Sequence, residues 1–335
     1  MPTPQPVVAP PSRAAVFLVA TVNPGGETAV RETLADLAGL TRSVAFRSPD
    51  DRLSCVVGIG SAGWDRLVGG PRPRELHPFP PLTGPRHRAP ATPGDLLFHL
   101  RARRMDLCFE LARLLIDALG PAVTVVDETH GFTYFDERDL LGFVDGSENP
   151  EGEAAAEAVL VTAAEDDPPF HGGSYVVVQK YVHDMTAWQA LTVEQQEHVI
   201  GRTKAANVEL PDDVKPADSH VALNAIVDED GTERQILREN MPFGTIGRGE
   251  FGTYFIGYAR TPEVTERMLR NMFLGDPPGR TDRILDFSTA VTGGLFFVPS
   301  ADLLDDLPAP PAAAAAAVQR DDSLRIGSLK GARAS

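Results

Sequence analysis

Asp145 is the ionisable residue with the most unusual surroundings in the sequence. It follows five residues of little or no polarity and precedes a glycine and a proline-terminated turn, in the run 140–150, LLGFVDGSENP. An unpaired carboxylate that is buried costs free energy or shifts its pKa, so it needs a cationic partner or a role in proton transfer. The alternative is an ordinary aspartate at a turn.

His220, one of eight histidines, is the second candidate. It ends the run 216–220, PADSH, and leads into an apolar segment that we expect to be a strand, where a neutral imidazole can face a cofactor. Further along, Arg238 is a natural cation for Asp145. Asn240 lies two residues past Arg238, so on a strand the two side chains share one face. A surface or core histidine and a loop-capping asparagine are the alternatives.

Composition limits the class of protein. The chain has 335 residues, of which 42% are hydrophobic, so it is long enough for two globular domains. A net charge of -16 argues against nucleic acid or an anionic membrane as partner. The first 13 residues lack the order of a signal peptide, and no segment has the ~18 apolar residues of a membrane span. Only two cysteines, Cys55 and Cys108, occur, each in a largely apolar run. These features predict a cytoplasmic protein without a disulfide framework.

The glycine-rich segments do not indicate a nucleotide site. Residues 291–294 and 247–249 lack the spacing of a phosphate-binding loop, and no GxGxxG motif follows the first predicted strand. The sequence therefore favours neither a nucleotide-dependent enzyme nor a Ser/His/Asp hydrolase.

The strands and helices that must position these side chains form two successive series of similar order along the chain. The first series comprises predicted strands at 15–22, 53–58, 96–101 and 123–131, with helices at 27–40, about Trp64, and at 105–119. A proline-rich loop spans 71–93. The second series comprises predicted strands at 174–181, 221–227, 235–242 and 254–259, with one or two helices in 185–203 and a helix at 261–274. The order is β-α-β-β-α-β, so we expect an α+β protein of two tandem ferredoxin-like units with antiparallel sheets, similar to a dimeric α+β barrel.

Composition changes after Ala301. We expect a disordered N-terminal arm at 1–13, domains at 14–141 and 142–302, a Pro/Ala linker at 303–320 and a tail at 321–335. In the tail, Leu324, Ile326 and Leu329 are spaced by glycine and serine. A segment this short either binds a groove or stays disordered.

Residues 142–146 match a known family signature. They resemble the GxxDG motif of dye-decolourising (DyP-type) haem peroxidases, with Gly142, Asp145 and Gly146 in the signature positions. Further runs are similar to the type-B members of that family: 215–221, 236–244, 252–258 and 271–276. The resemblance extends over roughly residues 12 to 302.

This resemblance implies a haem b peroxidase that reduces H2O2 and oxidises dyes, phenolics or other one-electron donors through an oxoferryl intermediate. It also implies that the second unit holds most of the haem and that the chain forms a homo-oligomer of unspecified size. Three alternatives remain. The first is a haem- or iron-handling protein of the deferrochelatase kind, and the second is a structural cargo protein. The third is a chlorite dismutase, which shares the architecture but fits the signature less well.

The family pattern also assigns roles to residues. It implies that His220 is the iron ligand, with its other ring nitrogen bonded to a carboxylate; we expect Asp282, with Asp286 in reserve. Asp145 and Arg238 are placed on the open haem face. There an acid moves the peroxide proton and a guanidinium stabilises developing charge, and we expect Arg238 to contribute more. Asn240 is expected to donate to peroxide or water.

Five further residues are candidates for holding the macrocycle. Arg202 is a plausible clamp for a haem propionate, and its alternative is a solvated arginine at a helix end. Four apolar residues are candidate haem walls, although such a stripe is more often ordinary core: Phe255, Met272, Phe273 and Leu285.

The tail carries a second resemblance. Residues Ser323–Gly331 are similar to the SLxIGSLKG core of peptides that load cargo into encapsulin shells. This implies an encapsulin shell protein as partner, in addition to H2O2 and a small-molecule reductant, and a location inside an encapsulin nanocompartment in the cytoplasm.

Overall fold

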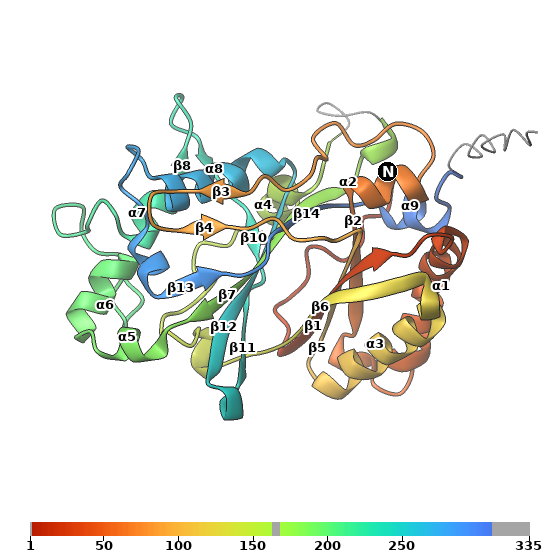
Figure 1. The fold of residues 1–335 in the computed structure, drawn as a ribbon, viewed down its shortest axis with the longest axis horizontal. Coiled ribbons are helices and arrows are strands. Elements are labelled where there is room, and N and C mark those ends of the chain that lie inside the picture. Colours follow the sequence, from red (N-terminus) through yellow and green to blue (C-terminus); the bar gives the residue numbers. More distant parts are fainter. Residues whose placement is uncertain (1, 163–167, 310–335) are drawn as a thin grey trace, which may run out of the picture.

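The computed structural model describes residues 2–162 and 168–309. Its centre is one ten-stranded sheet in which neighbouring strands run antiparallel (Figure 1). The first half of the chain forms β1 (Ala14–Val22), α1 (Glu27–Ala45), β2 (Ser54–Gly60), α2 (Ser61–Leu67), β3 (Leu82–Thr83), β4 (Arg88–Ala89), β5 (Leu96–Ala102), α3 (Met105–Leu119) and β6 (Val123–Phe132). Short 3-10 turns lie at η1 (Pro49–Asp51), η2 (Gly120–Ala122) and η3 (Phe135–Glu137).

The second half contains more short elements. Its helices are α4 (Gly152–Val159), α5 (Met185–Gln189), α6 (Val193–Ile200), α7 (His220–Asn224), α8 (Pro262–Leu274) and α9 (Ala301–Asp305), with 3-10 turns η4 (Pro168–Phe170), η5 (Ile246–Arg248) and η6 (Arg283–Asp286). Its strands are β7 (Ser174–His183), β8 (Ile226–Val227), β9 (Glu233–Arg234), β10 (Leu237–Arg238), β11 (Met241–Thr245), β12 (Glu250–Ala259), β13 (Ser288–Ala290) and β14 (Gly294–Val298).

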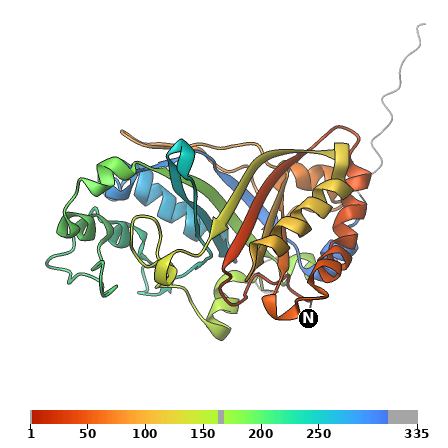
Figure 2. The ribbon, with the colours of Figure 1, turned by 90° about the horizontal axis from the view of Figure 1, so that it is seen from below.

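The N-terminal unit is a four-stranded sheet covered by helices on one face. Its strand order is β2-β5-β1-β6, and α1 and α3 lie against it in Figure 2. Because side chains alternate along a strand, β1 contributes to two cores. Val16 and Leu18 pack with the helices, whereas Phe17 and Val19 lie in a second cluster on the other face.

The C-terminal unit repeats this topology and continues the same sheet. Its order is β10-β12-β7-β14, and β14 then pairs with β2 of the first unit through Phe296 and Phe297. At the far edges β6 approaches β11, where a Cβ on Gly131 would lie 2.6 Å from the Cβ of Met241. The sheet thus curves around the second core cluster. The predicted fold class, two tandem ferredoxin-like units with antiparallel sheets in a barrel-like arrangement, is confirmed.

Two predicted strands near the site differ from the structure, the first in element type and the second in continuity. The segment 221–227 begins as helix α7, because the Ser219 side chain caps the helix by accepting the N–H of Ala222. A two-residue strand follows it. The predicted strand 235–242 is present as two short strands, β10 and β11, and between them the N–H of Glu239 still donates to Ile256 of β12.

The N-terminal arm is not disordered over residues 2–13. Gln5 is 5% exposed, and its amide donates to the carbonyls of Val57 and Pro299 while it accepts the N–H of Val57. Val7 is also buried, so the arm fills a place in the core.

The first residues of the predicted linker pack against the N-terminal unit. Arg31 donates to the carbonyls of Leu307 and Pro308, and Leu307 is buried. The rest of the linker and the tail lie outside the described residues. Within those residues, no helix combines the length and apolar character needed to span a membrane.

Candidate functional site

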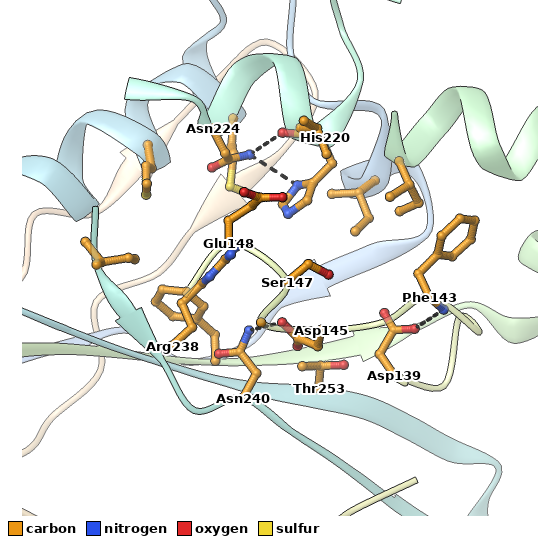
Figure 3. Close-up of a pocket in the computed structure, with 18 of the residues that line it drawn as sticks. Asp139, Phe143, Asp145, Ser147, Glu148, His220, Asn224, Arg238, Asn240 and Thr253 are labelled. Carbon is orange, nitrogen blue, oxygen red and sulfur yellow. Dashed lines mark hydrogen bonds between the residues drawn. The ribbon is translucent and has the colours of Figure 1, made fainter. Parts of the chain in front are cut away.

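The candidate site is a cavity in the C-terminal unit. It is bounded by α7 and α8, by strands β7 and β12, and by the loop 139–148 (Figure 3). Its empty volume, counted out to the open mouth, is about 1580 Å³.

His220 lies on one side of the cavity, at the first turn of α7. Its Nδ1 is 2.7 Å from Oδ2 of Asp282, whose side chain is fully buried. The same carboxylate accepts the N–H of Ile284 at 2.9 Å and so caps η6, which fixes it in place. Because Nδ1 donates to Asp282, the lone pair on Nε2 is free to point into the cavity.

The electrostatics of His220 reflect its position. Burial lowers the pKa of the imidazole, but the charge and hydrogen bond of Asp282 outweigh this, so the pKa is raised overall. Arg238 lowers and Asp145 raises the pKa of His220 through space. Both groups therefore lie close enough to influence the imidazole across the cavity.

Asp145, Arg238 and Asn240 form the opposite side. The amide of Asn240 donates to Oδ1 of Asp145 at 3.3 Å, and its oxygen accepts the N–H of Ile256 at 3.0 Å. Across the described ranges, no ion pair joins Arg238 to Asp145, contrary to the direct pairing expected from the sequence. Asn240 takes the partner position beside the carboxylate instead. The Nε of Arg238 is buried and has no hydrogen-bond partner in the described part of the chain.

Asp139 is a further cavity residue that the sequence analysis missed. Its Oδ1 accepts the N–H of Phe143 at 3.0 Å. Burial, with a smaller contribution from Asp145, raises the pKa of this carboxyl to about 7. The sequence feature that could have identified Asp139 as a site residue is its position six residues before Asp145, just ahead of the apolar run.

Arg202 reaches the cavity from the segment after α6. Its Nη1 lies 2.6 Å from Glu148, and its Nε and Nη2 donate to the side chain and carbonyl of Asn207. The side chain is 14% exposed, so it is not the solvated helix-end arginine of the alternative interpretation.

The four apolar candidates divide evenly. Phe255 and Met272 line the cavity. Phe273 and Leu285 do not; they are 1% and 3% exposed and belong to the core cluster on the helix-covered side. Their expected haem contacts are therefore not supported. Consecutive helix residues such as Met272 and Phe273 point in different directions, which explains why only one of them reaches the cavity.

The donor set fits a haem. Within residues 2–162 and 168–309 no three His, Cys, Asp or Glu side chains are grouped so as to bind a metal ion directly. A single oriented imidazole suits iron whose other ligands come from a macrocycle. Apolar side chains such as Phe255 and Met272 provide its walls, and the Arg238 and Asp145 charges face the imidazole.

Comparison with known proteins gave concordant matches. The model described as "Dyp-type peroxidase, N-terminal" matches residues 4–133, and "Dyp-type peroxidase, C-terminal" matches residues 136–303. The chain is 63% identical over 330 residues to a dye-decolorizing peroxidase of Mycolicibacterium paratuberculosis, which covers 98% of this chain and 93% of that protein. A deferrochelatase of Escherichia coli is 25% identical over 175 residues, covering 48% of this chain and 41% of that protein.

Solved structures agree with these matches. The encapsulated DyP-type peroxidase from Mycobacterium smegmatis superposes with a TM-score of 0.91 at 64% identity, covering 93% of this chain and all of that one. DypB from Rhodococcus jostii RHA1 has a TM-score of 0.88 at 58% identity, covering 91% of this chain and 98% of that one. A variant of DypB has been solved in complex with heme.

Proposed function

The chain belongs to the Dyp-type peroxidase family, and from that premise we propose how its own residues carry out a haem b-dependent peroxidase reaction. It is an oxidoreductase that reduces H2O2 and oxidises dyes, phenolics or other one-electron donors. The observation that carries the assignment of roles is the His220–Asp282 pair, which faces Asp145, Arg238 and Asn240 across one cavity.

His220 would hold the iron through Nε2. Asp282 keeps the proton on Nδ1 and makes the imidazole a stronger donor. Arg202 would bind a haem propionate, and the propionate would replace Glu148 as its hydrogen-bond acceptor. Haem, when bound, supplies the iron at which peroxide binds and the electrons that break the O–O bond.

On the opposite side, Asp145 is placed to accept a proton from peroxide and to return it to the oxygen that leaves as water. Asn240 holds one carboxylate oxygen of Asp145 and so fixes its orientation. Arg238 contributes a charge that does not titrate and stabilises the negative charge developing on the leaving oxygen. Since no ion pair to Asp145 is found for Arg238 in the described residues, its charge remains available to the cavity.

We infer that Arg238 carries the larger share. Mixing haem-loaded Arg238→Leu with H2O2 in a stopped-flow spectrometer should show the first absorbance change slowed by about 10²–10³-fold, the loss typical of removing a stabilising charge. Asp145→Ala should slow it less. Arg248→Leu, an exposed arginine of η5, is the matched control and should react normally. A near-normal rate for the Arg238 variant contradicts the assignment.

A haem- or iron-handling function is the second candidate. It is supported only by the partial match to a deferrochelatase. Turnover of a dye with H2O2, compared with release of metal-free porphyrin from the same preparation, separates the two functions. Porphyrin release that exceeds dye turnover would favour the second candidate.

We also propose that the chain is packaged in an encapsulin nanocompartment through Ser323–Gly331. The similar M. smegmatis protein is described as encapsulated, and the tail here is similar to peptides that load cargo into encapsulin shells. Co-expression with a shell protein should give shells that contain the full chain but not a chain lacking 321–335, and the truncated protein should keep its peroxidase activity. Equal packaging of both would refute this role for the tail.

A homo-oligomer is the remaining proposal. Exposed aromatic side chains support it: Phe109 is 52%, Phe132 38% and Phe135 72% exposed. Phe132 and Phe135 both contact the ring of Tyr134, and Phe109 contacts His130 on the same strand as Phe132. Apolar surface of this kind commonly marks an interface. Phe135→Glu should lower the mass measured by light scattering, whereas Phe46→Glu, at a phenylalanine that is 82% exposed, should not.

A further inference from the structure

Arg238 lies at an open edge of the sheet. Strand β10 pairs with β12 on one side, where Arg238 is opposite Gly257, and β10 ends the strand order on the other side. The N–H of Glu239 donates to Ile256 on β12 at 3.1 Å, so the backbone groups of Arg238 point the opposite way, toward the edge. Backbone N–H and C=O groups at the edge of a sheet need a hydrogen-bond partner from elsewhere in the chain or from water.

Asn149 supplies that partner with its side chain. Its Oδ1 accepts the N–H of Arg238 at 3.0 Å, and its Nδ2 donates to the carbonyl of Arg238 at 2.7 Å. One side-chain amide thus makes both hydrogen bonds that a neighbouring strand would make. We call these two bonds the Asn149 bracket.

The bracket ties the loop of Asp145 to the strand of Arg238. The N–H of Asn149 donates to the carbonyl of Gly146 at 3.0 Å, which closes a turn directly after Asp145. Gly146 has a φ of +77°, and a Cβ there would lie 3.0 Å from Nδ2 of Asn149. Glycine at 146 therefore permits both the turn and the close approach of the amide. On the other side of the loop, the N–H of Asp145 donates to the carbonyl of Glu137 at 3.0 Å.

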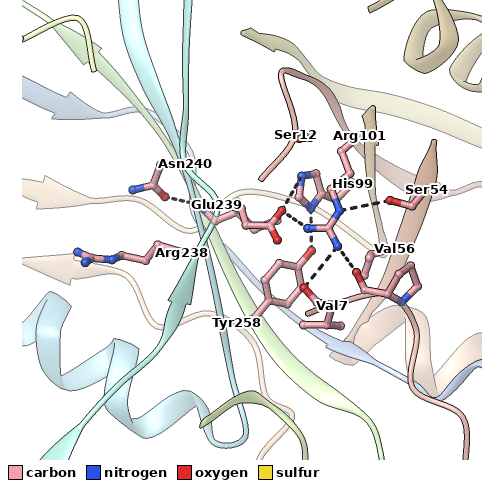
Figure 4. Close-up of polar contacts among 12 residues, drawn as sticks. Val7, Ser12, Ser54, Val56, His99, Arg101, Arg238, Glu239, Asn240 and Tyr258 are labelled. Carbon is pink, nitrogen blue, oxygen red and sulfur yellow. Dashed lines mark hydrogen bonds and ion pairs between the residues drawn. The ribbon is translucent and has the colours of Figure 1, made fainter. Parts of the chain in front are cut away.

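The strand is also held from the barrel side. Glu239, between Arg238 and Asn240, points into the barrel and forms a buried ion pair with Arg101 of β5, while Arg238 points away (Figure 4). Asn240 is fixed by the N–H of Ile256. With the barrel side fixed, the Asn149 bracket holds both backbone groups of Arg238 to the Asp145 loop, in addition to the hydrogen bond from Asn240 to Asp145.

We propose that Asn149 is a positioning residue that fixes the distance between the guanidinium of Arg238 and the carboxylate of Asp145. The proposal rests on the peroxidase function proposed above. Small displacements of a charge from the reacting atoms are costly, since a shift of about 1 Å can reduce a rate by about 10²-fold. Asn149 itself does not need to touch the substrate for this role.

The test compares Asn149→Ala with Asn23→Ala. Asn23 also makes two side-chain hydrogen bonds, to the carbonyl of Pro121 and from Thr124, but in the N-terminal unit. Three quantities are measured: hydrogen exchange of the Arg238 amide, affinity of the haem-loaded protein for fluoride, and the stopped-flow rate with H2O2. Fluoride reports on hydrogen-bond donors opposite His220 without any turnover.

For Asn149→Ala we expect amide exchange about tenfold faster, fluoride binding about tenfold weaker and peroxide reaction at least about tenfold slower. Haem loading should be unchanged, and Asn23→Ala should match the wild type in all three. Asn149→Asp keeps an acceptor for the Arg238 N–H but loses the donor. It should retain most of the amide protection and show intermediate fluoride affinity, and it provides the test if the alanine variant does not fold.

The proposal is overturned if Arg238 exchange rises without any loss of fluoride affinity, because the bracket would then be structural only. It is also overturned if exchange does not rise. Failure of the wild-type protein to bind haem would refute the proposed function, whereas the exchange measurement on haem-free protein would still decide whether the bracket exists.

Discussion

Replacing Asp282 by asparagine tests the central contact of the site. The substitution keeps the shape of the side chain but removes the charge that lies 2.7 Å from Nδ1 of His220. The asparagine amide cannot present oxygens to both His220 and the N–H of Ile284, because one of its two ends is a donor. His220 therefore loses either its charged acceptor or its fixed orientation.

The magnitude follows from the burial of the pair. Asp282 is 0% exposed, so solvent does not screen its charge. Hydrogen bonds to charged groups contribute about 1.5–3 kcal/mol, and loss of a carboxylate behind a metal-binding histidine typically costs about 10–100-fold in metal affinity or activity. A factor of ten in the ratio of ferric to ferrous stabilisation is about 59 mV for a one-electron couple, so a loss that falls on the ferric state raises the reduction potential by about 60–120 mV. The sign is positive because the missing negative charge stabilised the more positive ferric state.

The assay combines a haem titration followed by the Soret absorption with a spectroelectrochemical measurement of the potential. Asp286→Asn is the control, since Asp286 lies one turn further on and contacts Arg86 and His87 instead of His220. If Asp282→Asn leaves both affinity and potential at the wild-type values, the carboxylate does not act on the iron ligand and the reasoning fails.

Three further predictions concern stability. The pKa of Asp139, raised to about 7, exceeds its unfolded value of about 3.9, so the folded state binds the proton more tightly and wild-type stability falls as pH rises from about 4 to about 7. Asp139→Asn should flatten this slope, gaining about 4 kcal/mol at pH 8 relative to pH 4 in urea unfolding of haem-free protein; an unchanged slope contradicts the raised pKa of Asp139. Glu239→Ala should cost about 3–5 kcal/mol because it leaves the charge of Arg101 buried, and Arg101→Met with Glu239→Leu should recover most of that loss. Gln5→Ala should cost about 3 kcal/mol in thermal and urea unfolding, whereas a disordered arm would show no effect.

Regular elements were predictable where sequence periodicity was strong. The helix predicted at 105–119 has those bounds in the structure, since its apolar residues recur at helical spacing and a glycine follows. Errors occur where a helix-capping side chain, or a side chain from a distant part of the same chain, decides the local conformation. Ser219 turns an apolar segment of strand-like composition into a helix, and Asn149 replaces a neighbouring strand beside Arg238. Neither a helix cap nor a contact between residues far apart in the sequence appears in the periodicity of the segment that it alters.

For the site, the resemblance placed His220, Asp145, Arg238 and Asn240, and the structure brings all four to one cavity. Arg238 and Asn240 face the same cavity, as the sequence analysis expected, but the expected direct pairing of Arg238 with Asp145 is replaced by the contact from Asn240. The interruption of the strand after Arg238 means that Arg238 and Asn240 are not simply alternate residues of one regular strand. Asp139 was missed because its raised pKa arises from burial, which is a property of the folded chain.

The pairing of β14 with β2, together with the contact between Gln5 and Pro299, affects how the protein is made. The last strand of the sheet completes the edge of a unit that was synthesised first, and the N-terminal arm acquires its partner at Pro299 only after about 300 residues have left the ribosome. We therefore expect an open, incomplete sheet throughout most of translation. The full sheet can close only after β14 has emerged.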